Sequence, residues 1–221
     1  MVARFKAVLF DWRGTLVHIP SPIWHVTRAL ESTGRPADRQ TVEAVIERVQ
    51  DVSDLPEFVE AERVIDLSAE VHRETTMRMY NQGGLDIELA EALYRVEWEL
   101  ESRPLFPDVP GTLAAIHDRG VKVALVSDIH FDIRPDCIAQ GIDTFVDAYI
   151  LSCEVGIQKP DPRMFLAATS AVDVQPDEAL MVGDTAATDG GAAAIGIATL
   201  ILPRPDELVT RGLDIVVRLL A

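Results

Sequence analysis

Short apolar runs that alternate with helical patterns constrain the fold of this chain more than any other feature. Residues 5–11 form one such run, and from about residue 106 onward β-branched runs and helical patterns alternate to residue 202. We predict buried strands at residues 5–11, 121–127, 147–151, 179–183 and 197–202. We predict helices at residues 111–119, 131–140, 161–171 and 187–195. This alternation favours an α/β fold, in which helices cover both faces of a parallel sheet.

Residues 21–102 have a different pattern, because apolar residues recur there with the period of a helix and no convincing strand is present. Gly83-Gly84 and Asp54-Leu55-Pro56 are expected to separate helices. The block interrupts the α/β pattern directly after the first strand. We therefore predict an all-helical cap domain over residues 17–105, inserted into a core of residues 1–16 and 106–221. Such an insert would cover the C-terminal strand ends, where ligands bind in open α/β sheets.

The composition of the chain limits which classes of molecule it can bind. The chain of 221 residues carries a net charge of −16, which disfavours nucleic acid and anionic membrane as partners. A phosphorylated substrate remains compatible, because a bound divalent cation and a few local donors override net charge. Cys137 and Cys153 form no metal motif or disulfide framework, so we expect both to be reduced and buried in a cytoplasmic protein. No apolar run approaches the ~20 residues that span a bilayer, and we expect neither signal peptide nor membrane anchor.

Polar residues with catalytic potential stand at predicted strand ends and helix starts. They are Asp11 with Gly14 and Thr15, Ser127 with Asp128, Lys159, and Asp184 with Asp189. A carboxylate at Asp11 is a candidate nucleophile toward phosphorus or carbon. Asp11 and Asp184 offer the hard oxygen ligands that Mg²⁺ prefers. Each segment alone is typical of an ordinary cap or turn, but the four together, in one order, indicate a single site.

The remaining groups complete that candidate site. Ser127 could donate a hydrogen bond to a phosphoryl oxygen, and Lys159 could neutralise the anion and the nucleophile. Asp189 could orient Lys159 or a metal-bound water. Asp128 and Thr15 are expected to support the neighbouring groups.

The chain resembles the haloacid dehalogenase superfamily of hydrolases. Phe10-Asp11-Trp12-Arg13-Gly14-Thr15-Leu16 is similar to its first motif, and Val126-Ser127-Asp128 to its second. Lys159-Pro160-Asp161-Pro162 is similar to the third motif, and Gly183-Asp184 through Asp189 to the fourth. The resemblance implies a Rossmann-like core, a nucleophilic Asp11, and Mg²⁺ held by Asp11, the backbone carbonyl of Arg13, and Asp184.

Arg13 departs from the pattern of that family. The family's phosphatases have a second aspartate at this position, which protonates the leaving oxygen and then activates water. An arginine stays protonated at any usable pH and cannot perform either step. Losing a general acid–base group typically lowers a rate by about 10²–10⁴-fold.

Three hypotheses accommodate Arg13. In the first, a Mg²⁺-dependent phosphatase reroutes its proton transfer through His18, His25 or His130. In the second, Arg13 is an anion clamp, and the substrate has a good leaving group, as an acyl phosphate does. In the third, the fold serves binding only, with Arg13 paired to Asp184 or Asp11. The candidates for contact with the substrate are His18, Trp24, His25 and His130.

Two other branches of the family fit less well. Dehalogenases attack carbon and need no acid for a halide, but the retained Asp184 argues against that reaction. The phosphonate-cleaving branch needs a lysine in the cap, whereas Lys6, Lys122 and Lys159 all lie outside it. The favoured prediction is Mg²⁺-dependent phosphoryl hydrolysis of a small phosphorylated metabolite. Both a monomer and a homodimer are compatible with the sequence.

Overall fold

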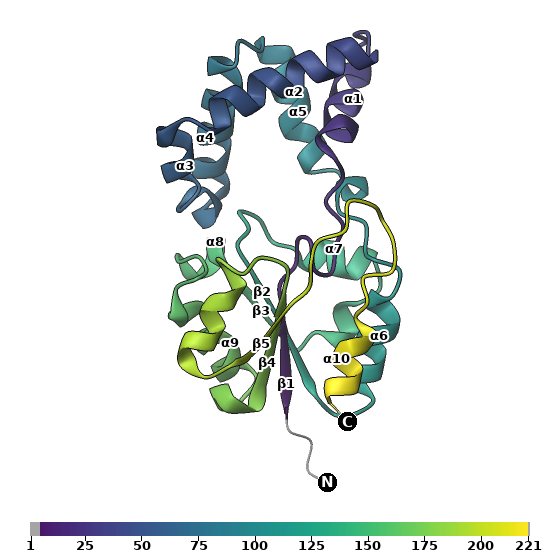
Figure 1. Ribbon diagram of the computed structural model, residues 1–221, viewed down its shortest axis with the longest axis vertical. Coiled ribbons are helices and arrows are strands. Elements are labelled where there is room, and N and C mark those ends of the chain that lie inside the picture. The colour runs from purple at the N-terminus through teal and green to yellow at the C-terminus, as the bar shows by residue number, and fades with distance from the viewer. Residues whose placement is uncertain (1–4, 221) are drawn as a thin grey trace.

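The computed structural model describes residues 5–220 and contains one parallel sheet with the strand order β3-β2-β1-β4-β5 (Figure 1). The strands are β1 (Ala7–Phe10), β2 (Lys122–Ser127), β3 (Ala148–Leu151), β4 (Ala179–Gly183) and β5 (Ala198–Ile201). Each lies within a range predicted from the sequence, and the parallel α/β architecture is confirmed. Because β1 is central, the residue after it lies between the ends of β2 and β4.

Helices cover both faces of this sheet. They are α6 (Val109–His117), α7 (Arg134–Ala139), α8 (Ser152–Val155), α9 (Pro162–Ala171) and α10 (Asp214–Leu219), with short 3₁₀ turns η3 (Asp143–Phe145), η4 (Pro176–Glu178) and η5 (Asp189–Ile195). Figure 1 shows α6 and α10 on one side of the sheet and α9 on the other.

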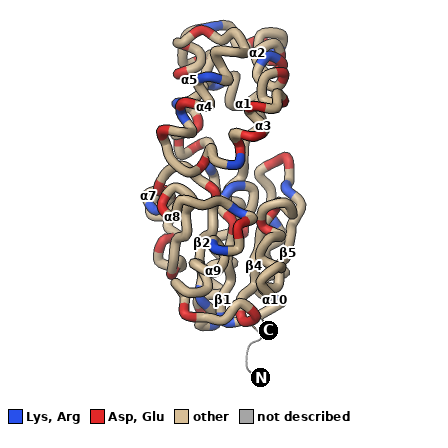
Figure 2. The backbone as a smooth tube through the Cα atoms, turned by 90° about the vertical axis from the view of Figure 1, so that its left-hand side faces the viewer, with Lys and Arg blue, Asp and Glu red and all other residues tan. Residues whose placement is uncertain are grey.

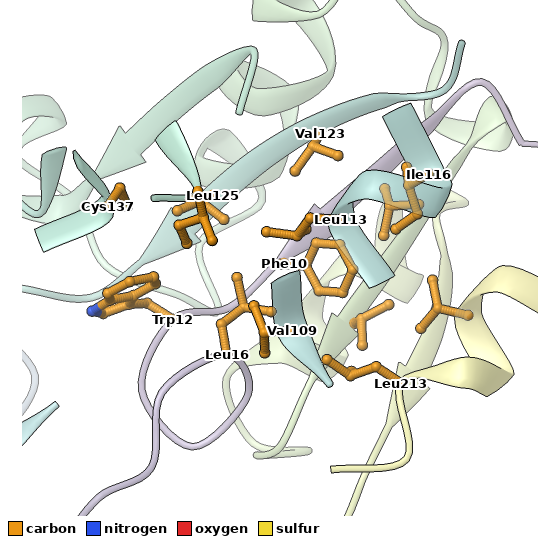
Figure 3. Close-up of a cluster of buried hydrophobic side chains, with 14 of the residues drawn as sticks. Phe10, Trp12, Leu16, Val109, Leu113, Ile116, Val123, Leu125, Cys137 and Leu213 are labelled. Atoms are coloured by element: carbon orange, nitrogen blue, oxygen red, sulfur yellow. The ribbon is translucent and has the colours of Figure 1, made fainter. Parts of the chain in front are cut away.

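The sequences of the strands explain why both faces of the sheet are buried. Val8 and Phe10 of β1 belong to the hydrophobic cluster that includes residues of α6 and α10, whereas Ala7 and Leu9 belong to the cluster that includes residues of α9. Consecutive side chains of a strand point to opposite faces, so a strand that is apolar throughout must be covered twice. Figure 3 shows the first cluster, with Phe10 beside Leu113.

Three sequence predictions for the core need correction. The range 187–195 forms the 3₁₀ helix η5 rather than an α-helix. Its Gly190-Gly191 pair disfavours a regular helix, and a Cβ at Gly191 would lie 2.6 Å from the Pro160 side chain. Helices α8 and α10 were not expected, because both are short. Cys153 is only half-buried, whereas Cys137 is buried as expected, and both thiols are free.

Residues 22–102, all of which the structure describes, contain helices and no strand. The elements are α1 (Pro22–Ser32), α2 (Arg39–Ser53), α3 (Pro56–Ala61), η1 (Ile65–Leu67), α4 (Ala69–Gln82), α5 (Ile87–Glu97) and η2 (Leu100–Ser102). Ser21, Asp38, Ser68 and Asp86 accept hydrogen bonds from backbone N–H groups in the first turns of α1, α2, α4 and α5. These caps satisfy N–H groups that have no partner within the helix.

This helical unit has a hydrophobic cluster of its own, in which α1, α2 and α5 supply residues such as Leu30, Val45 and Leu89. It lies beyond the C-terminal ends of the strands (Figure 1). Within the described residues, no helix has the length and apolar character needed to cross a membrane.

Two chain segments connect the sheet with the helical unit, and they pair with each other. Val17 forms β-bridges with Arg13 and with Leu105. The His18 N–H donates to the Pro104 carbonyl at 2.8 Å, and the Phe106 N–H donates to the Leu16 carbonyl at 3.0 Å. The outgoing and returning segments therefore leave the core side by side, next to the turn that follows Asp11.

Replacing Phe10 by alanine should lower the free energy of unfolding by about 3–5 kcal/mol, because it removes a fully buried ring from the centre of the sheet. Urea denaturation measures the change. Ile23→Ala is the control, because Ile23 is 58% exposed and its loss should change stability by less than about 0.5 kcal/mol. A loss below about 1 kcal/mol for Phe10→Ala would contradict this account of the core.

Candidate active site

Lys159 joins two carboxylates at the C-terminal edge of the sheet. Its Nζ lies 2.7 Å from Asp11 Oδ1 and 2.6 Å from Asp189 Oδ1. Asp11 directly follows β1, Lys159 precedes α9, and Asp189 begins η5. All three side chains are buried, with exposed fractions of 9%, 3% and 1% for Asp11, Lys159 and Asp189. The fold thus brings together three residues that the sequence predicted to share one site.

Neighbouring groups hold these carboxylates in place. The Thr15 hydroxyl donates to Asp11 Oδ2 at 3.0 Å, which leaves both Asp11 oxygens with a partner. Asp189 Oδ2 accepts from the backbone N–H groups of Asp184 and Thr185 at 3.1 and 3.0 Å. Asp189 therefore fixes the ammonium of Lys159 relative to the end of β4.

Burial shapes the charges of the site. It raises the pKa of Asp11 to about 6, although the attraction of Lys159 lowers that pKa in part. Burial alone would lower the pKa of Lys159, but the attraction of Asp11 and Asp189 more than offsets this, so its pKa is raised. Burial also raises the pKa of Asp128 to about 6. Lys159 therefore stays a cation at neutral pH, beside a carboxylate that ionises near pH 6.

Asp184 has a cationic partner that the sequence analysis did not anticipate. The Arg204 Nε donates to Asp184 Oδ2 at 2.7 Å, and the Asp184 side chain is only 4% exposed. Gly14 makes room for this pair: it adopts a φ of +84°, and a Cβ there would collide with the Asp184 carboxylate and approach Arg204. Arg211 stabilises the same turn, because its Nε donates to the Gly14 carbonyl at 2.9 Å.

The carboxylates of Asp11, Asp184 and Asp189 form a donor set that fits a hard divalent cation. One oxygen of each lies within 4.8 Å of the others. Oxygen ligands suit Mg²⁺ or Ca²⁺, whereas nitrogen- or sulfur-preferring metals would find no matching donor in this set. Arg204 supplies the positive charge on Asp184 in this structure, so a bound cation would have to compete with it.

Arg13 points toward the helical unit rather than toward the carboxylates. Its Nη1 lies 3.2 Å from Glu97 Oε1, at the end of α5, and its side chain is 35% exposed. This ion pair differs from the pairing of Arg13 with Asp184 or Asp11 that the third hypothesis expected. Lys159 pairs with Asp11 instead, and Arg204 pairs with Asp184. Arg13 therefore links the turn after β1 to helix α5 of the helical unit.

Ser127 and Asp128 lie where the sequence predicted, at the end of β2. Ser127 is 1% exposed and belongs to the same sheet edge as Asp11. Asp128 Oδ1 accepts from the Lys159 backbone N–H at 2.8 Å. Asp128 therefore positions the segment that carries Lys159.

The four aromatic candidates lie in different surroundings. His18 packs edge-on against Phe106, at 5.7 Å between ring centroids. Trp24 packs against the hydrophobic cluster of the helical unit. His25 lines a small cavity together with Arg13 and Glu97, and burial lowers its pKa. Of the four, His25 is therefore the one that shares a cavity with Arg13.

His130 contacts the cap rather than the carboxylates. It stacks on His72 of α4, with ring centroids 3.4 Å apart and planes at 12°. Its Nδ1 lies 3.1 Å from Asp66 Oδ1. His130 thus contacts α4 and η1 of the helical unit, and the sequence did not single out His72 or Asp66.

A family model for haloacid dehalogenase-like hydrolases matches residues 5–196. This chain belongs to that family of hydrolases. It is 30% identical over 206 residues to the glyceraldehyde 3-phosphate phosphatase of Methanopyrus kandleri, which covers 90% of this chain and 84% of that protein. It is 38% identical over 119 residues to the phosphoserine phosphatase of Thermus thermophilus, a match that spans 53% of this hydrolase and about half, 47%, of that relative.

The fold of the hydrolase is shared with solved structures. A dehalogenase with an intermediate complex superposes with a TM-score of 0.72 at 22% identity, covering 100% of this chain and 99% of that one. At this identity the likeness shows the fold alone. Phosphatases and dehalogenases thus share the architecture seen here, and the side chains of the site must distinguish between them.

Arg204 and Glu97 are the principal site residues that sequence reasoning missed. Arg204 follows β5 by three residues and so lies at the same sheet edge as Asp11 and Asp184. Its position after a predicted strand is a signal that could have identified it. Glu97 carried no such signal, because it lies on a helix whose orientation the sequence does not specify.

Divalent cation binding by the hydrolase should depend on pH through Asp11. Because the pKa of Asp11 is raised to about 6, the protonated acid must lose its proton to ligate a metal below that pH. With Mg²⁺ as the probe, we expect the association constant to fall about tenfold per pH unit below pH 6 and to level off above it. Calorimetric titration between pH 5.0 and 7.5 measures this dependence.

Asp11→Asn is the control for this titration, because it removes the group but not the shape. That variant should bind Mg²⁺ weakly at every pH and lose the slope. Equal affinity of the wild type at pH 5.0 and 7.5 would show that Asp11 is not a ligand.

Proposed function

We propose that this protein is a Mg²⁺-dependent phosphoryl hydrolase that acts on a small phosphorylated metabolite through an aspartyl-phosphate on Asp11. The observation that carries the proposal is the buried Asp11 carboxylate, held by Lys159 and Thr15 beside two further carboxylates. Such an arrangement offers a nucleophile, a fixed cation and oxygen ligands at one point. Relatives named as phosphatases support the choice of phosphate over halide.

The reaction has two steps. In the first, a carboxylate oxygen of Asp11 attacks phosphorus, the bond from phosphorus to the leaving oxygen breaks, and the leaving group departs with that electron pair. In the second, a water oxygen attacks phosphorus and the bond between phosphorus and the Asp11 oxygen breaks. Asp11 returns as the carboxylate, and both hydrogens of the water leave with the inorganic phosphate. A Mg²⁺ ion held by Asp11, Asp184 and the Arg13 carbonyl would neutralise charge on the phosphoryl oxygens.

The side chains of this chain have complementary roles in both steps. Lys159 balances the charge of Asp11 and of the phosphoryl group, and Asp189 keeps its ammonium in position. Ser127, at the same sheet edge, donates to a phosphoryl oxygen. Thr15 orients Asp11. These groups act by position and electrostatics, which supply most of the catalysis in phosphoryl transfer.

Arg13 restricts the leaving group. Its guanidinium holds its proton and cannot pass one to the departing oxygen, so the leaving group must be stable as an anion or be protonated by another residue. His25 is the candidate for that second route, because it shares a cavity with Arg13 and an imidazole can carry a transferable proton. Burial lowers the pKa of His25, so the protonated donor form becomes more populated as the pH falls. Glu97 holds Arg13 at the mouth of the site, where it serves as an anion clamp.

One observation favours a second candidate function, binding without turnover. Arg204 neutralises Asp184 at 2.7 Å, and a tight ion pair there would lower the affinity for Mg²⁺. Arg204 is 48% exposed, so it can swing toward solvent, and we therefore rank hydrolysis first. We propose that residues 17–105 act as the cap that closes over this site, and the two free thiols are compatible with a cytoplasmic protein.

Asp11→Asn should lower phosphate release by at least about three orders of magnitude, because the amide cannot form the covalent intermediate. The assay uses 4-nitrophenyl phosphate and acetyl phosphate, with and without Mg²⁺. Asp118→Asn is the matched control, since its side chain is 82% exposed and lies outside the site. Undiminished turnover by Asp11→Asn would exclude the covalent route, and wild-type inactivity on every phosphate tested would favour binding without turnover.

Arg13→Asp should restore the missing acid–base group. We expect kcat for phosphate esters of aliphatic alcohols to rise by about 10²–10⁴-fold. The rise for acetyl phosphate should be smaller, because its leaving group needs no proton and only the attack of water on the aspartyl-phosphate gains a base. Arg13→Ala separates the two effects of the change, because it also loses the contact with Glu97 but gains no carboxyl group. An equal gain in both variants would mean that Arg13 inhibits the site rather than merely failing as an acid.

A further inference from the structure

A cavity of about 650 Å³ lies beside the candidate active site, between the cap and the loop that follows β5. Its wall comes from residues 19–21, from helices α1, α2, α4 and α5, and from the loop at residues 204–206. The wall is largely apolar, with Ile19, Pro22, Ile46, Val49, Leu93 and Pro205 among its residues. A cavity of this size encloses the body of a drug-sized ligand.

This cavity adjoins the cationic side of the site. Arg204 lines it and also donates to Asp184. A smaller cavity of about 190 Å³ shares His25, Tyr80 and Leu93 with it and adds Arg13 and Glu97. A ligand with its phosphate at Asp11 would therefore pass Arg13 or Arg204 before its remaining atoms entered the apolar space.

The polar side chains of the wall are Ser21, His25, Gln50, Tyr80, Arg204 and Asp206. The Ser21 hydroxyl accepts from the Trp24 N–H at 3.3 Å, and the Ser21 carbonyl lies 3.3 Å from His25 Nδ1. A sugar placed here would also face the apolar part of the wall, where its hydroxyls would find no partners. Each such loss weakens binding by about one to two orders of magnitude, whereas each buried methylene strengthens it by up to about fourfold.

We propose that the substrate of this site is an apolar molecule that carries a phosphate on a weakly basic oxygen, as in an aryl phosphate, with its apolar body in the 650 Å³ cavity. This inference rests on the proposed function. Two independent features favour the same class: Arg13 supplies no proton to the leaving oxygen, and most residues of the cavity wall are apolar. A small sugar phosphate has a leaving oxygen that needs a proton and no apolar body to fill the cavity.

Binding of n-alkylphosphonates, from propyl to octyl, tests the cavity without any turnover. The series keeps one head group and varies only the apolar length. With Mg²⁺ present, we expect calorimetric affinity to rise by up to about fourfold per methylene until the cavity is filled. Ribose 5-phosphate should bind at least about tenfold more weakly than octylphosphonate. Affinity independent of chain length, or preference for the sugar phosphate, would overturn the inference.

Variants locate the effect. Val49→Asn places an amide in the cavity wall and should flatten the dependence on chain length, with little change for propylphosphonate. Val59→Asn is the matched control, because Val59 is 52% exposed and lies outside the wall. A wild-type slope in Val49→Asn would place the alkyl chain elsewhere and overturn the assignment.

Turnover of phenyl and 2-naphthyl phosphate, measured in parallel, separates the two proposals. If both phosphates are hydrolysed at the same rate and phosphonate affinity does not depend on chain length, the apolar substrate is excluded and the proposed hydrolase activity stands. Rising phosphonate affinity with no hydrolysis of any phosphate would support the apolar ligand and remove the hydrolase.

Discussion

Lys159 lies buried between Asp11 and Asp189, and the other groups of the site are arranged around this contact. A buried ammonium keeps its proton only when opposite charges offset the loss of water. Here two carboxylates do so, and each comes from a different part of the sheet edge. The contact forms only when β1 and β4 are paired in register and the turn after β4 brings Asp189, the first residue of η5, back to the strand end. The chemistry of the site therefore depends on the alignment of the whole parallel sheet.

Local charges also reconcile an acidic protein with an anionic substrate. The net charge of −16 is spread over the surface, and at physiological ionic strength charges beyond about 8 Å are largely screened. Lys159, Arg13 and Arg204 reach the strand ends from three segments of the chain. Figure 2 shows basic and acidic residues together at the level where the cap meets the sheet. The sign of the field that a bound phosphate experiences is thus set by a few neighbours.

The sequence predicted the part of the structure that periodicity and strand ends encode. Five strands, the helical insert and the cluster of Asp11, Lys159 and Asp189 follow from apolar runs that end in polar residues. The partner of Arg13 did not follow, because Glu97 approaches it only through the folding of the cap. Arg204 stood after the last strand and outside any motif. The sequence analysis predicted an α-helix where η5 lies. Gly191 is a glycine because a Cβ there would clash with Pro160, and this contact cannot be read from the sequence.

The pairing of the two connecting segments, through Val17 and Leu105, has a consequence for how the cap meets the core. A domain tethered at two adjacent points cannot diffuse away, so its groups face the site at a fixed effective concentration. His25 and Glu97 arrive from the same chain that carries Asp11, whatever the dilution of the protein. The contacts of these residues with the strand ends are thus intramolecular, and they do not depend on the supply of a partner.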